Sequence, residues 1–286
     1  MRAFAILLAM LLLGAAAPRV RPAAPSCAPV PGAAPLLAMA ERRYFIVGEL
    51  HGTVEIPSLF GDLVCEAAAG GPVIVGLEMP QESQAALDAW LASDGGPESR
   101  AALLRERFWR FHDGRASEAM LGLLDRLRAM KAGGAAIRLL AFVPVVARAA
   151  TQTPYEQAMA ANWRGALAAA PGARLLVLVG SIHSRIALYR DFEPAAMHLP
   201  RAESLTFAPL PVGGLAYNCR REGCGAHSAG PVARQMPARE IVATPAEARP
   251  TMAYDYVYAP GTAFSPSPPA VPGPRPDRVQ PPGGAR

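Results

Sequence analysis

The sequence predicts an α/β protein whose mostly parallel sheet is flanked by helices and carries a helical insertion between its second and third strands. Short apolar runs alternate along the chain with longer segments that have helical spacing of apolar residues. Strands that alternate with helices of this length form βαβ units, which build parallel sheets. The chain has 286 residues, 51% of them hydrophobic, which is enough for one such domain with a sizeable core.

Four apolar runs are expected to form the sheet, and each is short enough to be a buried strand. They cover residues 44–48, 73–77, 137–143 and 175–179. Two shorter strand-like pieces, 204–207 and 254–258, follow among glycines and prolines.

Five segments between these runs have the spacing of helices. They are 55–69, the stretch from Pro80 to Leu91, the stretch through Leu103 to Phe108, 117–131 and 154–169. The second to fourth of them lie between the second and third strands and form the predicted insertion.

The two ends of the chain differ from this pattern. Residues 1–17 have a positive start at Arg2, an apolar stretch and small residues, as in a secretory signal peptide, with an uncleaved anchor as the alternative. Residues 18–43 are expected to be a linker, 44–262 the α/β domain and 263–286 a disordered tail rich in proline and glycine. The protein is therefore expected to be exported to the periplasm.

All four cysteines lie beyond the signal segment, where an oxidising compartment permits disulfides. A bond between Cys219 and Cys224 is favoured over half of a zinc knuckle, because no second ligand pair follows. Pairing of either residue with Cys27 or Cys65 remains open. Lipidation of Cys27 is the alternative that would anchor the protein to a membrane.

The charge pattern argues against a nucleic-acid surface. The net charge is +5, but arginines supply nearly all of the positive charge and are scattered along the chain. Nucleic-acid surfaces use clustered basic residues with interleaved aromatic ones. The expected ligand is a small molecule, and a homodimer is compatible with the sequence.

Polar residues follow three of the four predicted strands. Glu49 and His51 follow the first, Glu78 the second and His183 the fourth. The carboxyl ends of parallel strands meet at one edge of a sheet, where ligands bind. Each of these side chains taken alone has a structural explanation, such as helix capping. Together they predict a site that either holds a divalent transition metal or carries out acid–base catalysis.

A second cluster lies at residues 108–115. Phe108, Trp109 and Phe111 with Arg115 predict either an aromatic wall that holds a flat or anionic ligand, or a helix end that packs into the core. The two interpretations carry equal weight.

These motifs resemble the superfamily that groups ChaN-like haem-uptake proteins, erythromycin esterases and Tiki/TraB metalloproteases. The resemblance rests on GELHGT (48–53), GLE (76–78), DGRASEAM (113–120), GSIHS (180–184) and GGLAYNCRREGCG (213–225). The third and fifth motifs favour the ChaN-like branch. The chain departs from the pattern at Ser181, where the family has asparagine, and in lacking a clear lipoprotein cysteine.

The resemblance implies two functions. The first is an exported haem- or iron-binding protein, with cofactor contacts from Arg115, His112, His183 and Tyr217. The second is a metal-dependent or His/Glu hydrolase of an ester or peptide. Its catalytic and metal residues would be Glu49, His51, Glu78 and His183, with His51 or Glu49 as the general base. The sequence has no GxSxG motif, so a serine triad is not expected.

Overall fold

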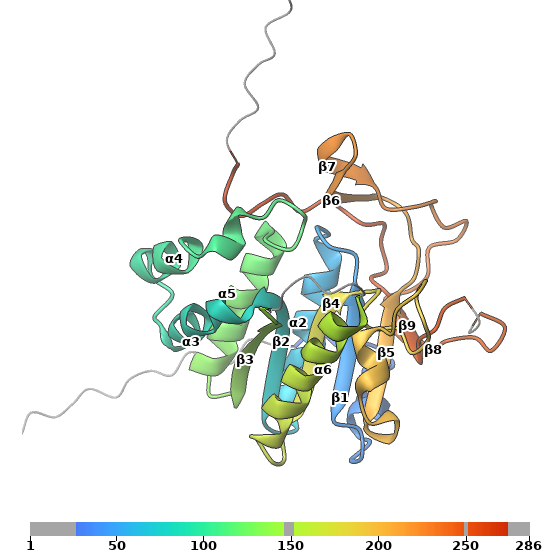
Figure 1. Ribbon diagram of the computed structural model, residues 1–286, viewed down its shortest axis with the longest axis horizontal. Helices are drawn as coiled ribbons and strands as arrows, with labels where there is room; N and C mark the ends of the chain where they lie inside the picture. Colours follow the sequence, from blue (N-terminus) through green and yellow to red (C-terminus); the bar gives the residue numbers. More distant parts are fainter. Residues whose placement is uncertain (1–26, 146–151, 249–250, 274–286) are drawn as a thin grey trace, which may run out of the picture.

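A seven-stranded sheet runs through the centre of the protein in the order β3-β2-β4-β1-β5-β9-β8 (Figure 1). The computed structural model describes residues 27–145, 152–248 and 251–273. The strands are β1 (Tyr44–Glu49), β2 (Val73–Pro80), β3 (Ile137–Val143), β4 (Arg174–Gly180), β5 (Ser204–Pro209), β8 (Glu240–Ala243) and β9 (Tyr256–Ala259). All neighbouring pairs are parallel except β8 and β9, which are antiparallel. The mostly parallel α/β fold is thus confirmed.

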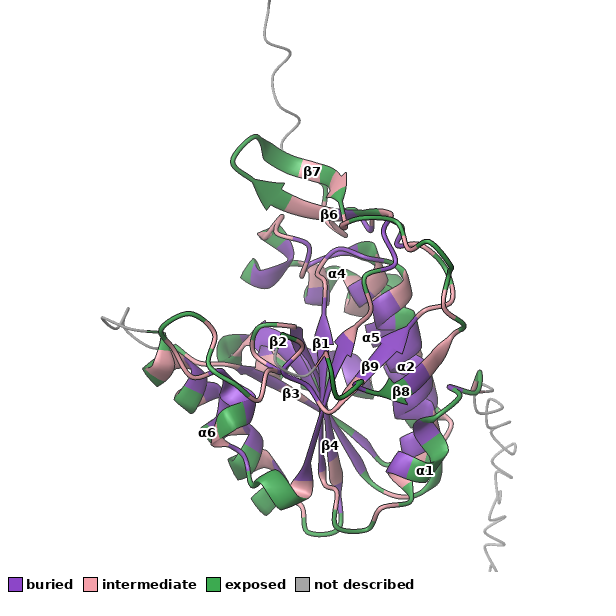
Figure 2. Cartoon of the chain, turned by 90° about the vertical axis from the view of Figure 1, so that its right-hand side faces the viewer, coloured by how far each residue is buried: buried purple, intermediate pink, exposed green. Residues whose placement is uncertain are grey.

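Helices cover both faces of the sheet. They are α1 (Ala33–Leu37), α2 (Glu55–Ala69), α3 (Gln84–Ala92), α4 (Pro97–Leu104), α5 (Glu118–Ala132) and α6 (Thr153–Ala168). In Figure 2, α6 lies on one side of the sheet, and α1, α2 and α5 lie on the other. Each face has its own hydrophobic cluster. One cluster includes Trp163 of α6, and the other includes Phe60 of α2 and Leu124 of α5. The two faces of the sheet are therefore both buried, which explains why the central strands are apolar throughout.

The helical insertion between the second and third strands of the chain is present as α3, α4 and α5. Ser117 caps α5 by accepting a hydrogen bond from the Met120 backbone N–H. The predicted single helix through Phe108 is divided in two, because α4 ends at Leu104 and a 3₁₀ turn follows at Arg107–Arg110.

The described part of the segment predicted as a linker, residues 27–43, is folded against the domain. It contains α1, buries Val30, Ala33 and Leu36, and is joined to α2 by a disulfide between Cys27 and Cys65. The proline-rich composition of this segment does not predict a packed structure, but burial of these three apolar side chains is sufficient to hold it against the domain. A lipid thioether on Cys27 is incompatible with this bond. The predicted signal peptide and residues 18–26 lie outside the described residues.

The tail also differs from its prediction, because residues 263–273 pack against the domain. Phe264 and Ser267 are buried there. Prolines lack an N–H, but their carbonyls still accept hydrogen bonds, and this tail uses them to cap a helix. Residues 274–286 lie outside the described part of the chain.

An antiparallel hairpin of β6 (Leu215–Arg220) and β7 (Gly223–Ser228) lies apart from the main sheet at the top of Figure 1. A disulfide between Cys219 and Cys224 closes it, which confirms the favoured pairing. Among the described residues, no helix is long and apolar enough to cross a membrane.

Candidate active site

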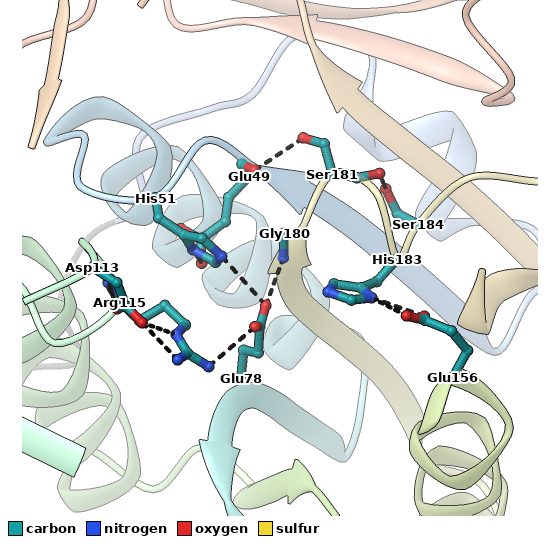
Figure 3. Close-up of polar contacts among 10 residues, drawn as sticks. All are labelled: Glu49, His51, Glu78, Asp113, Arg115, Glu156, Gly180, Ser181, His183 and Ser184. Atoms are coloured by element: carbon teal, nitrogen blue, oxygen red, sulfur yellow. Dashed lines mark hydrogen bonds and ion pairs between the residues drawn. The ribbon is translucent and has the colours of Figure 1, made fainter. Parts of the chain in front are cut away.

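Three neighbouring strands bring the predicted site residues together. The strand β4 lies between β2 and β1, and Glu49 at the end of β1 is in register with Gly180 at the end of β4. Glu78 lies near the end of β2, and its Oε2 accepts a hydrogen bond of 2.7 Å from the Gly180 N–H. The expected convergence at one sheet edge is therefore present, and Gly180 is its centre (Figure 3).

His51 lies between two buried carboxylates. Its Nδ1 donates a hydrogen bond of 2.9 Å to Glu49 Oε1, and its Nε2 lies 3.6 Å from Glu78 Oε2. Burial alone would lower the pKa of His51, but the charges of Glu49 and Glu78 outweigh it and raise this pKa to about 9. The imidazole is therefore held as a cation at neutral pH.

Glu78 is balanced by cations on several sides. Burial would raise the pKa of Glu78, but His51, His183 and Arg115 together lower it. The Arg115 guanidinium lies 3.3 Å from Glu78 Oε1 and is held by Asp113 at 2.6 Å. Glu78 thus stays ionised in a site where an isolated carboxylate would be costly.

His183 is positioned by a carboxylate that sequence reasoning did not identify. Its Nδ1 donates to both oxygens of Glu156, each at 2.8 Å, and the Glu156 side chain is fully buried on α6. Burial would lower the pKa of His183, but the hydrogen bond to Glu156 and the charge of Glu78 raise it. The backbone N–H of Ala195 donates to Glu156 at 2.9 Å and fixes the carboxylate in turn.

The two imidazoles face one space above Gly180. A Cβ built on Gly180 would lie 3.0 Å from His51 Nε2, 3.5 Å from Glu78 Oε2 and 3.5 Å from His183 Cδ2. Figure 3 shows the two rings on either side of Gly180 and Glu78. Only glycine leaves this space open, which explains the residue at the end of β4.

A pocket of about 330 Å³ opens over this space. Its lining consists of Glu49, Leu50, His51, Asp113, Gly180, Ser181, Ile182, His183 and Asn218. The volume is at the lower end of the range for small-molecule sites. Charged groups form one part of the lining, and the apolar side chains of Leu50 and Ile182 form another.

The loops that carry the two histidines are fastened to each other. The Ser181 hydroxyl donates to the Glu49 backbone carbonyl at 2.9 Å and joins the two loops. The Tyr258 hydroxyl of β9 donates to the Gly48 carbonyl at 2.5 Å and fixes the end of β1. Ser181, which departs from the family pattern, thus makes a backbone contact inside the site. These two bonds hold the backbone that carries the site residues in place.

The residues predicted to bind haem do not gather in this pocket, apart from His183. Arg115 hydrogen-bonds to Glu78 and Asp113 and is not among the residues that line the pocket. His112 lies against Gly273 of the tail. Tyr217 contacts Gly52 through its backbone. Of the two interpretations of the cluster at 108–115, packing into the core is the one that holds for Phe108 and Trp109, which are 2% and 1% exposed.

The four predicted metal ligands do not present four free donors to one ion. Glu49 and Glu156 occupy the Nδ1 atoms of the two histidines, and Glu78 already binds Gly180 and Arg115. Across the described ranges, no group of three or more His, Cys, Asp or Glu side chains has an arrangement that could hold a metal. Glu49 thus positions His51, and the donor set does not fit the predicted four-ligand centre.

Comparisons with known proteins give a fold relationship. No protein-family model matches the chain, and no curated protein shows a significant match. Among solved structures, an erythromycin esterase variant, EreC, in its open conformation matches with a TM-score of 0.52 at 10% identity, over 81% of this chain and 93% of the esterase.

Two further solved structures match less well. The type III effector HopBA1 has a TM-score of 0.45 at 15% identity, over 83% of this chain and 97% of the effector. ChaN of Campylobacter jejuni, described with cofacial haem binding, has a TM-score of 0.40 at 11% identity, over 62% of this chain and 85% of ChaN. At these identities the esterase match shows a shared fold, and membership of the ChaN-like family stays a prediction.

Proposed function

We propose that this protein is a hydrolase that cleaves a small ester or amide by acid–base catalysis between His183 and His51. The observation that carries the proposal is the pair of imidazoles above Gly180, each fixed on Nδ1 by its own carboxylate. An imidazole held in this way has its Nε2 free for proton transfer and its tautomer defined. The fold shared with an erythromycin esterase is consistent with this chemistry.

The surroundings of the two Nε2 atoms suggest different roles. His51 Nε2 has the Glu78 carboxylate 3.6 Å away, and this ion pair favours the protonated ring. No hydrogen bond to His183 Nε2 occurs among the described residues, which leaves it available to a water molecule. We assign His183 as the general base and His51 as the general acid.

In this reaction, His183 Nε2 takes a proton from water while the water oxygen forms a bond to the substrate carbonyl carbon. The bond between that carbon and the leaving group then breaks, and His51 Nε2 gives its proton to the leaving oxygen or nitrogen. Glu156 and Glu49 stabilise the imidazolium at each stage, and the pocket holds the acyl group. Proton transfer from His183 back to His51 restores the starting state.

The proposal is tested with a panel of p-nitrophenyl and amide substrates and the variants His183→Ala and His51→Ala. Each substitution should lower kcat by at least about 100-fold, the usual contribution of a positioned acid or base. His227→Ala, on the hairpin and outside the pocket lining, is the matched control. Circular dichroism verifies the fold. Parent-like rates in both site variants would contradict the proposal.

Haem binding is the second candidate, and the His183–Glu156 pair favours it. A histidine whose Nδ1 bonds to a buried carboxylate is a basic ligand with a free Nε2. Titration with haemin should then produce a Soret band that His183→Ala removes and His112→Ala preserves. A band that does not depend on His183 would contradict this candidate.

We also propose export to an oxidising compartment, the periplasm in a bacterial cell. The two disulfides support this location, since such bonds are rare in the cytosol. Mass spectrometry of the protein from its native host should find an N-terminus between residues 18 and 27, and an intact Met1 would contradict export.

A further inference from the structure

The hairpin β6–β7 contributes one residue, Asn218, to the pocket lining and is packed closely against the loop of His51. Gly52 has a φ of 74°, and a Cβ there would collide with the Tyr217 carbonyl oxygen. The Tyr217 N–H donates to the Gly52 carbonyl at 2.9 Å, so β6 runs directly beside the loop that carries His51. Gly114 also approaches Tyr217 and extends this contact to the loop of Asp113 and Arg115.

The side-chain amide of Asn218 is unusual in its hydrogen bonding. Asn218 lines the pocket, and its Oδ1 is buried without a hydrogen-bond partner among the described residues. Leaving a buried acceptor unpaired costs free energy, and such atoms in folded proteins call for a partner from outside the chain. Of the other buried unpaired side-chain atoms in the described ranges, none belongs to a residue that lines this pocket.

We propose that Asn218 is a specificity-determining residue that accepts a hydrogen bond from an O–H or N–H group of the bound substrate. The unpaired oxygen needs an O–H or N–H donor, and a molecule in the pocket that Asn218 lines can supply one. The adjacent apolar surface of Leu50 and Ile182 suits the carbon skeleton of the same molecule. The substrate class is thus a small acyl compound that carries a hydroxyl or amide N–H near its reacting carbonyl. The reaction part of this inference rests on the proposed function, but the recognition part does not.

The Cys219–Cys224 bond supports this role, because it joins the residue after Asn218 to the opposite strand. A short disulfide-closed hairpin restrains the backbone at Asn218. A polar group on such a rigid support selects its ligand at low entropic cost.

The test uses pairs of p-nitrophenyl esters that differ in one group, such as the 2-hydroxypropanoate and the propanoate, or the 3-hydroxybutanoate and the butanoate. The parent protein should have a higher kcat/KM for the hydroxylated member of at least one pair. Asn218→Ala should reduce that preference about tenfold, as expected for the loss of one buried hydrogen bond. Tyr217→Phe, whose side chain is outside the pocket lining, is the matched control and should keep the preference.

A binding measurement separates this inference from the proposed function. Calorimetry with the benzyl ketones of the same acyl groups, which have no leaving group and cannot be hydrolysed, should show tighter binding of the hydroxylated members to the parent and equal binding of both members to Asn218→Ala. If no ester is cleaved but this difference in binding is present, the proposed function fails and the role of Asn218 stands. If esters are cleaved and neither kcat/KM nor binding discriminates within any pair, or if Asn218→Ala keeps the discrimination, the role of Asn218 is overturned. The role is also overturned if no ester is cleaved and no difference in binding is found.

Discussion

At the scale of single residues, the site is a set of charges that stabilise each other after removal from water. Four carboxylates, Glu49, Glu78, Asp113 and Glu156, alternate with Arg115 and two histidines. Each buried charge has an opposite partner within hydrogen-bond or ion-pair distance, which is the condition under which buried charges are tolerated. Neutralising any single member is therefore expected to change the pKa values of His51, Glu78 and His183, which depend on their charged neighbours.

The pKa of His51 makes a testable contribution to stability. Because this pKa is raised from 6.5 to about 9 on folding, the protonated imidazole stabilises the folded state fully below pH 6.5, and this contribution is lost as pH rises through 9. The loss in free energy of unfolding is expected to be on the order of 3 kcal/mol. NMR titration of the His51 ring and urea unfolding between pH 6 and 10 measure both effects.

Glu49→Gln is the informative variant for this titration. It removes the charge and weakens the hydrogen bond that raise the pKa of His51, so the ring should titrate at lower pH and the stability should decline earlier. An unchanged ring pKa in Glu49→Gln would show that Glu49 does not govern His51.

At the scale of elements, the tail 264–271 connects the loop of His51 to the start of α5. Its carbonyl at Pro268 accepts from the Glu118 N–H at 2.8 Å, and the Ser267 hydroxyl accepts from the Ala119 N–H at 2.9 Å. These two N–H groups belong to the first turn of α5, where the helix itself supplies no acceptor. The helix begins shortly after Arg115. The Ser267 N–H also donates to the Gly52 carbonyl at 2.8 Å, beside His51. The tail thus caps α5 and ties down the loop of His51.

Ser267→Ala should therefore destabilise the protein by about 1–2 kcal/mol, as the loss of a helix cap does. The hydroxyl is buried, so water does not replace it on the Ala119 N–H. Ser265→Ala is the matched control, because its side chain is exposed and its backbone N–H, which bonds to Glu55, is unchanged. Urea unfolding compares the two variants, and equal midpoints would contradict the capping role.

At the scale of the whole molecule, the N-terminal segment is tied to distant parts of the chain. Cys27 bonds to Cys65 of α2, and Asp62 on the same helix binds both Arg126 of α5 and Arg239 near β8. The N–H of Ile241 donates to the Pro31 carbonyl at 2.8 Å. These contacts join α1, α2, α5 and the outer edge of the sheet into one unit.

The two disulfides should contribute unequally to stability. The Cys27–Cys65 bond closes a loop of 38 residues and the Cys219–Cys224 bond a loop of 5, so chain entropy predicts losses of about 4 and about 2 kcal/mol respectively on removal. Paired Cys→Ala variants measured by urea unfolding under identical conditions test this order. A larger loss for the hairpin pair would contradict it.

The sequence by itself determined the fold class, the strands β1 to β4 and the convergence of Glu49, His51, Glu78 and His183. These features depend on local patterns, because apolar runs, helical spacing and strand-end glycines express themselves within a few residues. Parallel strands then bring their carboxyl ends to one edge by geometry alone.

Only the tertiary structure decided the partners of those residues. In the sequence, Glu156 has the pattern of an ordinary acidic residue in the first turn of a helix. Only the packing of α6 against β4 brings its carboxylate within hydrogen-bond distance of His183. Asn218 and the capping tail reach the site from chain segments far along the sequence, and a proline-rich composition does not reveal which distant N–H groups its carbonyls will meet. The physical reason is that hydrogen bonds and burial between distant segments depend on strand order and packing, which local propensity does not specify.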